Sequence, residues 1–261
     1  MINVKNVNKT IVCKEKNKFF SKKKKKKKKI VDNVSFEISK GECVGILGLN
    51  GAGKTTLIKL MTGVLYPDEK DSIKIEGFVP AKKEKEYLKK ISLVSGQKNQ
   101  LLWDLTAMDT YLLHKKIYKI DNCSFDEKIQ NLSKTLKVEE YLNYPVRKLS
   151  LGQKMKLEII LALLHQPSIL FLDEPTIGLD IVTQESLLTF LKEYQEKYNA
   201  TIILTSHNMD DVERLCDRII FLENGKKIFD GTKADCFQNV SSIKMKINEL
   251  FFEKQNRDLE G

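Results

Sequence analysis

The sequence predicts an α/β fold with a mixed, largely parallel central sheet, an antiparallel β lobe and an inserted helical lobe. Three largely apolar runs, at 43–47, 168–172 and 201–205, are typical of strands that are covered on both faces. The alternation of apolar and polar residues at 34–38 indicates an antiparallel strand with one solvated face. Between 97 and 153 the pattern favours helices and contains no clear strand.

The other elements follow from local patterns in chain order. Residues 1–42 are expected to form short alternating strands, and a further strand at 73–75 completes the antiparallel lobe. Apolar residues recur at helical spacing over 187–194 and 209–216, which predicts two helices that cover the central sheet. Asn224-Gly225 lies between two apolar runs and predicts a tight hairpin turn.

The segment from Gly48 to Thr55 reads GLNGAGKT and matches the phosphate-binding pattern G-x-x-x-x-G-K-[ST]. It follows the run 43–47 and leads into a helix-like run at 56–61, which is the strand–loop–helix context that this motif requires. Glycines let backbone N–H groups point inward, and the helix N-terminus adds a positive dipole end. Lys54 is expected to reach the β- and γ-phosphates, and the Thr55 hydroxyl to ligate Mg²⁺. The predicted nucleotide contacts are Gly48, Leu49, Asn50, Gly51, Ala52, Gly53, Lys54, Thr55 and Thr56.

Two acidic residues end the apolar run SILFLDE at 168–174. Ligands of open α/β sheets bind beyond the carboxyl ends of the strands, where these acids are expected. Asp173 is expected to hold Mg²⁺ through water. Glu174 is expected to point to the other side of the strand and to polarise an attacking water. Without the phosphate-binding loop, both acids would be equally consistent with the solvated end of an ordinary strand.

Four further motifs occur in a fixed order. Gln97 follows an apolar run, LSLGQ occupies 149–153, GLD occupies 178–180, and His207 follows another apolar run. With the phosphate-binding loop and LDE, this order resembles the ATP-binding cassette (ABC) family, specifically a single nucleotide-binding subunit. The resemblance covers residues 30–232, most of the chain.

This resemblance implies roles within one subunit. Gln97 is expected to contact Mg²⁺ and water and to sense a membrane partner. Glu174 is expected to be the general base, and His207 the residue that contacts the γ-phosphate. Taken alone, a histidine after a strand or a glutamine in a loop is more often structural, so only the order of the motifs supports these two roles.

The resemblance also implies that two subunits enclose two ATP molecules. Ser150 and Gly152 are expected to contact the γ-phosphate of ATP held by the other subunit, and Gln153 is counted with them as a nucleotide contact. Asp180 is expected to shape the opposite site. Hydrolysis needs charge stabilisation around the γ-phosphate in a water-excluded site, and a helix N-terminus from a partner would close the open side.

Two features depart from the family's pattern. Leu151 stands where the family usually has glycine, and together with 103–105 (WDL) it makes the chain similar to subunits of type-2 ABC exporters. No aromatic residue that would stack on adenine lies near 11–13. Phe19 or Phe20 is a substitute, although hydrophobic packing explains them equally well. The preference for ATP over GTP therefore rests on the resemblance.

Trp103, the only tryptophan, lies shortly after Gln97. One interpretation is simple core packing. The other places it where the helical lobe receives a helix of the membrane partner.

Eight consecutive lysines, Lys22 to Lys29, account for most of the net charge of +10. The preferred interpretation is a solvated loop expansion between two strands, because long loops cost little. An arm that contacts anionic lipid headgroups and an arm that contacts nucleic acid are the alternatives. The run is not by itself a sign of a nucleic-acid enzyme.

The cysteines form no C-x-x-C pair and are expected to be thiols in a reducing cytosol. They are Cys13, Cys43, Cys123, Cys216 and Cys236. No apolar run reaches 18 residues, and residues 1–5 do not begin a signal peptide. A transport role therefore requires separate membrane-spanning subunits, with this chain peripheral at the cytoplasmic face.

We predict one ABC nucleotide-binding domain over 1–232, with a helical lobe at 97–153 and a lysine-rich insert at 22–29, followed by a short tail at 233–261. The predicted function is ATP hydrolysis that powers a membrane exporter, with ATP and Mg²⁺ as ligands. The expected partners of the chain are a second cassette and permease subunits. No nucleic acid is expected as a partner. A soluble ABC ATPase acting on translation or nucleic acid is the alternative, but the chain has neither a second phosphate-binding loop nor a heptad array. The spacing of LSLGQ and LDE argues against an unrelated kinase or GTPase.

Overall fold

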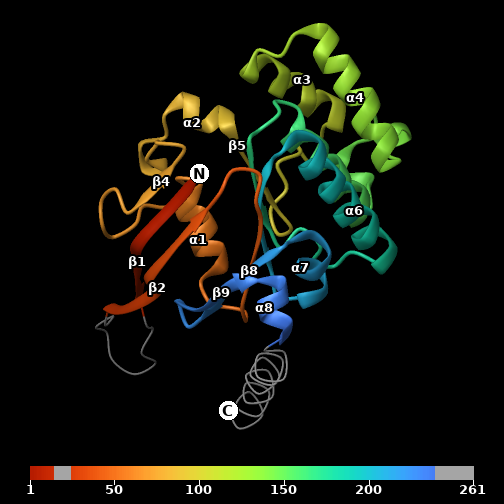
Figure 1. Cartoon of the computed structure of the whole chain (residues 1–261). Coiled ribbons are helices and arrows are strands. Elements are labelled where there is room, and N and C mark those ends of the chain that lie inside the picture. The colour runs from red at the N-terminus through yellow and green to blue at the C-terminus, as the bar shows by residue number, and fades with distance from the viewer. Residues whose placement is uncertain (15–24, 239–261) are drawn as a thin grey trace, which may run out of the picture.

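The computed structural model describes residues 1–14 and 25–238, which form two sheets with helices between and around them (Figure 1). The larger sheet has the strand order β5-β6-β7-β3-β8-β9, and the smaller sheet the order β2-β1-β4. The strands are β1 (Ile2–Lys14), β2 (Lys25–Ile38), β3 (Cys43–Leu47), β4 (Ile73–Ile75), β5 (Ile91–Ser95), β6 (Ile169–Asp173), β7 (Thr201–Ser206), β8 (Arg218–Glu223) and β9 (Lys226–Thr232). The α-helices are α1 (Lys54–Met61), α2 (Lys85–Lys90), α3 (Ala107–Tyr118), α4 (Asn122–Leu136), α5 (Leu151–Leu163), α6 (Ile181–Tyr198), α7 (Met209–Leu215) and α8 (Lys233–Gln238).

The larger sheet is parallel from β5 to β8, and only β9 runs antiparallel to its neighbour. Strand β3 lies between β7 and β8, and β6 lies between β5 and β7. Asp173 is in register with Thr205, and Leu47 with Ser206. The carboxyl ends of β3, β6 and β7 therefore meet at one edge. The predicted mixed, largely parallel sheet is confirmed.

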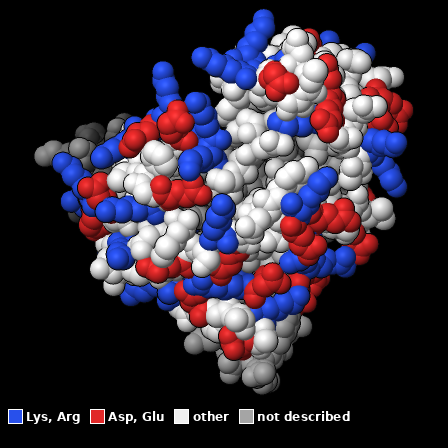
Figure 2. Space-filling model, turned by 45° about the horizontal axis from the view of Figure 1, so that its top comes forward, with Lys and Arg blue, Asp and Glu red and all other residues white. Residues whose placement is uncertain are grey.

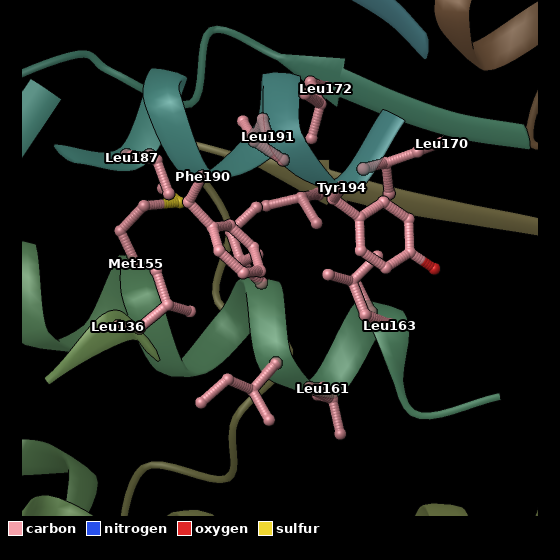
Figure 3. Packing of buried hydrophobic residues seen from close by; sticks show 14 of the residues in the cluster. Leu136, Met155, Leu161, Leu163, Leu170, Leu172, Leu187, Phe190, Leu191 and Tyr194 are labelled. Carbon is pink, nitrogen blue, oxygen red and sulfur yellow. The ribbon is translucent and has the colours of Figure 1, made fainter. Parts of the chain in front are cut away.

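Successive side chains of the larger sheet point to opposite faces and build two cores. On β6, Ile169 and Phe171 join a core shared with α1 and the smaller sheet, whereas Leu170 and Leu172 join the core beneath α5 and α6. Figure 3 shows how α5 and α6 interlock in the second core. Each fully buried side chain of this size contributes roughly 1.5–3 kcal/mol, so these two layers hold the strand ends in place.

The smaller sheet differs from the expected short strands. Strands β1 and β2 are 13 and 14 residues long, and residues 10–14 pair with 25–29 as a two-stranded ribbon beyond the reach of β4. The loop interpretation of the lysine run is therefore wrong for 25–29, because strand pairing uses backbone groups and does not depend on the side chains. Lys22–Lys24, Phe19 and Phe20 lie outside the described residues.

The stretch between β5 and α5 contains α3, α4 and short 3₁₀ turns, with an isolated bridge between Thr106 and Pro145. Thr106 and Asp121 cap α3 and α4 by accepting hydrogen bonds from backbone N–H groups. Figure 1 shows this lobe on one side of the larger sheet, away from the smaller sheet. Among the described residues, no helix combines the length and the apolar character needed to cross a membrane.

The hairpin between β8 and β9 is confirmed, with Asn224 and Gly225 at φ 47° and 83°. A Cβ on Gly225 would lie 2.5 Å from the carbonyl oxygen of Ile30, so glycine is required there. The helices predicted over 187–194 and 209–216 are also present, as α6 and α7.

Candidate functional site

A pocket of about 380 Å³ lies over the loop between β3 and α1, beyond the carboxyl end of β6. The loop and the first turn of α1 supply Asn50, Gly51, Gly53, Lys54, Thr55 and Thr56. Gln97, Glu174 and Ile177 line it from the ends of β5 and β6, and Ile11, Lys28 and Ile30 line it from the smaller sheet. Segments far apart in the sequence thus share one cavity.

The loop is shaped by glycines with positive φ. Gly48, Gly51 and Gly53 have φ of 156°, 84° and 106°. A Cβ on Gly53 would lie 2.7 Å from the carbonyl oxygen of Ile30, so glycine at this position also allows β2 to pack closely against the loop. The resulting turn opens directly into α1, whose N-terminus favours an anion.

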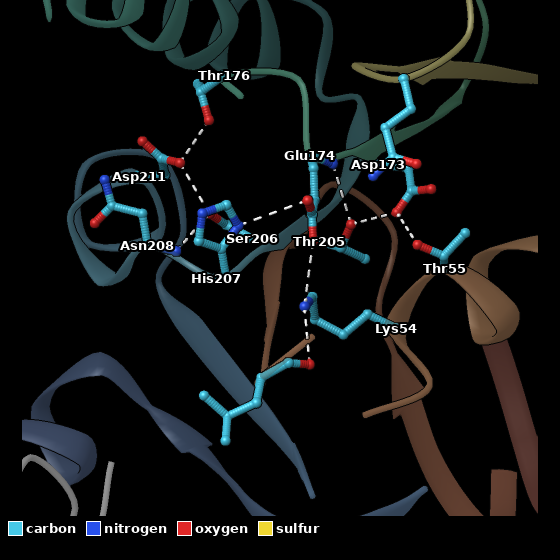
Figure 4. Close-up of polar contacts among 12 residues, drawn as sticks. Lys54, Thr55, Asp173, Glu174, Thr176, Thr205, Ser206, His207, Asn208 and Asp211 are labelled. Atoms are coloured by element: carbon cyan, nitrogen blue, oxygen red, sulfur yellow. Dashed lines mark hydrogen bonds and ion pairs between the residues drawn. The ribbon is translucent and has the colours of Figure 1, made fainter. Parts of the chain in front are cut away.

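Lys54 lies inside the loop and is only 4% exposed. Its Nζ donates to the carbonyl oxygen of Gly48 at 2.8 Å and of Leu49 at 3.4 Å, and lies 3.2 Å from Glu174 Oε1 (Figure 4). A buried ammonium needs such partners. Phosphate oxygens entering the loop would compete with Glu174 for this charge.

Asp173 holds the centre of an oxygen-rich corner of the site. Its Oδ1 accepts hydrogen bonds from the hydroxyls of Thr55 at 3.0 Å and Thr205 at 2.7 Å (Figure 4). Hydroxyl and carboxylate oxygens suit a hard cation, and Gln97 lines the pocket together with Thr55. This donor set fits Mg²⁺.

Glu174 lies just past β6 in the left-handed region, at φ 53°. The turn therefore sets the direction of the Glu174 side chain. The expectation had relied on the alternation of side chains along a strand, which does not apply at this position. Its backbone N–H donates to the carbonyl oxygen of Thr205 at 3.0 Å. Oε1 faces Lys54, and Oε2 lies 3.6 Å from His207 Nδ1. Strained non-glycine residues of this kind cluster at functional sites.

A buried network holds the turn that carries His207. Asp211 Oδ2 accepts from the hydroxyls of Thr176 at 2.6 Å and Ser206 at 2.8 Å, and Ser206 Oγ accepts from the backbone N–H of Asn208 at 2.9 Å (Figure 4). Sequence reasoning missed Asp211 and Thr205. An aspartate in the first turn of a helix ordinarily indicates only a favourable dipole contact, so the sequence carries no signal for this network.

The LSLGQ and GLD motifs lie elsewhere. Ser150 Oγ accepts from the backbone N–H of Gln153 at 3.2 Å, and the backbone N–H of Ser150 donates to the Gln153 side chain at 2.8 Å, which closes a capping box on α5. Asp180 caps α6 by accepting a hydrogen bond from the backbone N–H of Thr183 at 2.9 Å. Ser150, Gly152, Gln153 and Asp180 are absent from the described residues that line the pocket.

These two helix N-termini lie side by side. A Cβ on Gly152 would lie 3.0 Å from Thr183 Cγ2, and a Cβ on Gly178 the same distance from Leu151 Cδ2. Leu151 thus packs against the GLD turn, away from the residues that line the pocket.

The wall formed by the smaller sheet contains no aromatic side chain among the described residues that line the pocket. Ile11 and Lys28 are register partners across β1 and β2, and Ile30 touches Gly53. Alternation along β2 directs Lys28 and Ile30 to the same face. An aliphatic and cationic wall occupies the place expected for an aromatic residue.

Trp103 is 54% exposed, and Lys154 Nζ lies 4.5 Å from its ring centroid. The core-packing interpretation is therefore wrong. Leu102 and Leu105 beside it are also exposed. Figure 2 shows uncharged surface in the middle of the face seen there, with basic and acidic residues mixed around it.

The family model described as "ABC transporter" matches residues 31–177, more than half of the chain. The chain belongs to the ABC transporter family. It is the ATP-binding, ATP-hydrolysing cassette of that family.

Several named ATP-binding proteins are similar in sequence to this ABC cassette. The ABC transporter ATP-binding protein NatA of Bacillus subtilis is 34% identical over 229 residues, which cover 88% of this chain and 92% of NatA. The linearmycin resistance ATP-binding protein LnrL of the same organism is 36% identical, over 79% of this chain and 65% of LnrL. The Nod factor export ATP-binding protein I of Sinorhizobium fredii is 35% identical, over 77% of this chain and 58% of its own length. The chain thus spans less than two thirds of the last two relatives.

Solved structures agree with this assignment to the ABC family. An ATP-binding subunit of an ABC transporter superposes with a TM-score of 0.78 and 26% identity, over 97% of this chain and 98% of that one. A dimeric ATP-binding cassette in a post-hydrolysis state, bound to ADP and phosphate, gives a TM-score of 0.76 and 25% identity, over 89% and 98%.

Proposed function

We propose that this chain powers a membrane exporter by hydrolysing MgATP between two paired cassettes. The observation that carries the proposal is that Lys54, Thr55 and Glu174 line one pocket, to which the chain's own Ser150 contributes nothing. Asp173 lies beside this pocket, hydrogen-bonded to Thr55. Relatives named for Nod factor export and linearmycin resistance support the direction of transport. The transported substance is set by the membrane partner.

The loop residues Gly48 to Thr56 bind the phosphates, with backbone N–H groups at the N-terminus of α1 and with Lys54. Thr55, Asp173 and Gln97 would hold Mg²⁺, which neutralises phosphate charge when bound. Thr205 keeps the Asp173 carboxylate oriented through its 2.7 Å hydrogen bond.

Glu174 is the general base in this proposal. Its carboxylate is buried at the mouth of the loop, and His207 lies beside Oε2 on a turn that Asp211 holds. When phosphates take over Lys54, Glu174 loses its cationic partner and can accept the proton of an attacking water. His207 contacts the γ-phosphate and so distinguishes a site that holds a γ-phosphate from one that does not.

The second cassette completes the site. Ser150, Gly152 and Gln153 at the start of α5, with Asp180 at the start of α6, contribute to the pocket of the partner cassette and not to their own. Two nucleotides then lie between two copies, or between this chain and a paralogue. The dimeric cassette bound to ADP and phosphate supports this arrangement.

Membrane attachment in this proposal runs through partner subunits. The exposed group Leu102, Trp103 and Leu105 receives a helix of a permease at the cytoplasmic face. The lysine run, from Lys22 to Lys29, contacts anionic lipid headgroups in that position, apart from Lys28, which lines the nucleotide pocket. Residues 1–232 act as the cassette, with the helical lobe over 97–153, and residues 233–261 form its tail.

Gentle solubilisation of membranes with this chain tagged tests the proposal. A polytopic membrane protein recovered in stoichiometric amount is the expected result, together with MgATP hydrolysis that Lys54→Ala abolishes. Recovery of ribosomes or nucleic acid without a membrane protein would instead support the soluble ABC ATPase and contradict the exporter.

A further inference from the structure

A buried glutamate that the proposed mechanism does not use connects α5 to the loop that carries Gln97. Glu158 lies on the helix that Ser150 caps and is 2% exposed. Its Oε1 accepts hydrogen bonds from the backbone N–H groups of Gln100 at 2.5 Å and Leu101 at 2.9 Å. One carboxylate oxygen therefore fixes two consecutive backbone groups shortly after Gln97.

The other end of this loop is fixed to the larger sheet. The backbone N–H of Gly96 donates to the carbonyl oxygen of Asp173 at 3.0 Å. A Cβ at Gly96 would lie 2.1 Å from the carbonyl oxygen of Glu174, so the approach requires glycine. Gln97 thus lies on a short segment anchored at the end of β6 on one side and at Glu158 on the other.

The same segment continues into contacts with the residues that precede α5. The backbone N–H of Arg147 donates to the carbonyl oxygen of Trp103 at 3.1 Å, and that of Val146 to Leu105 at 2.9 Å. Residues 100–105 are therefore hydrogen-bonded to the chain on both sides of Ser150. Residues 146–147 make these bonds before Ser150, and Glu158 makes them after it.

We propose that Glu158 is a positioning residue that makes Gln97 and the Ser150 end of α5 move as one unit. The inference rests on the proposed function, since it concerns how a nucleotide contact in one cassette sets the surface offered to the other. A buried carboxylate that loses both donors would be left unsatisfied, so this contact resists separate movement of the two segments.

A residue that only filled the core would behave differently. Leucine has a similar size and no polar atoms, so it leaves the backbone N–H groups of Gln100 and Leu101 without their acceptor. Burial raises the pKa of Glu158 to about 7, so a neutral side chain at this position is compatible with the fold. Glutamine keeps an oxygen that can accept both hydrogen bonds, and leucine does not.

The test compares the purified full chain with Glu158→Gln, Glu158→Leu and Ile129→Ala. Ile129 is a buried residue of α4 in the same core, and its truncation gives a matched loss of stability away from the segment. We measure kcat and KM for ATP, Tm, and hydrogen exchange at the amides of Gln100 and Leu101. Glu158→Leu is expected to lower kcat at least about tenfold with KM within about twofold, and to speed exchange at both amides. Glu158→Gln is expected to retain kcat, and Ile129→Ala to lower Tm without this change in kcat.

A wild-type kcat in Glu158→Leu would overturn the inference, as would a loss in Glu158→Gln equal to that in Glu158→Leu. If kcat instead falls in step with Tm in both Glu158→Leu and Ile129→Ala, Glu158 acts only through the stability of the core, which would also overturn the inference. If the wild-type chain does not hydrolyse ATP, the proposed function fails instead. The hydrogen exchange comparison then still decides whether Glu158 holds the segment.

Discussion

Replacing Glu174 by glutamine separates two roles that the structure gives this carboxylate. Oε1 lies 3.2 Å from Lys54 Nζ, and both side chains are almost fully buried. At that distance the gross attraction between unit charges is about 5 kcal/mol at an effective dielectric constant of about 20. Desolvation offsets much of it, and about 1.4 kcal/mol is enough for a tenfold change in Kd.

Glu174→Gln is therefore expected to bind ATP about tenfold more tightly, because the phosphates no longer compete with a carboxylate for Lys54. Its turnover is expected to fall by about 10²–10⁴, since the general base is gone. Tight binding with slow hydrolysis should trap the paired cassettes. Nucleotide titration, a single-turnover hydrolysis assay and size-exclusion chromatography with ATP measure the three effects.

Glu185→Gln provides the control, because it removes one negative charge from an exposed pair with Arg214. It is expected to leave both Kd and turnover unchanged. An unchanged or weaker Kd in Glu174→Gln would show that the contact with Lys54 does not oppose nucleotide binding. Hydrolysis at the wild-type rate would contradict the base role.

Three further predictions follow from contacts of single side chains. Lys28→Ala is expected to raise KM for ATP several-fold and to reduce the salt dependence of KM. Lys27→Ala, on the opposite face of β2, is expected to leave KM unchanged. Equal effects of the two variants in steady-state kinetics would contradict a contact of Lys28 with the nucleotide. Trp103→Ala is expected to keep folding and nucleotide binding but to lose stimulation of the ATPase by the membrane partner, and unfolding of the purified variant would refute the contact role. Burial lowers the pKa of His165 to about 4, so the neutral ring contributes stability that is complete above about pH 6.5 and is lost as the pH falls toward 4. Melting temperatures of wild type and His165→Gln should therefore converge over that window, and a parallel decline would contradict the assignment.

The sequence by itself determined the fold class, the nucleotide loop and the order of the motifs. These depend on local patterns: apolar runs for buried strands, glycines at positions with positive φ, and a turn dipeptide between two strands.

The tertiary structure decided what depends on distant partners. Strand pairing recruited Lys25–Lys29 into β2 because the backbone of residues 10–14 lay opposite, whereas composition indicated a loop. The same hairpin brought Lys28 to the nucleotide pocket. The hydrogen bond that the free thiol of Cys43 donates to Cys216 Sγ at 3.3 Å, between residues far apart in the sequence, could likewise not be predicted before folding.

Burial and charge pairing could not be read from residue type either. An isolated glutamate in an apolar helix gives no sign that Glu158 accepts two backbone hydrogen bonds from a distant loop. A single tryptophan gives no sign of whether Trp103 is buried or exposed. Motifs specify chemistry because it needs fixed residue types at fixed spacing, but positioning depends on which surfaces the folded chain brings together, and only packing determines that.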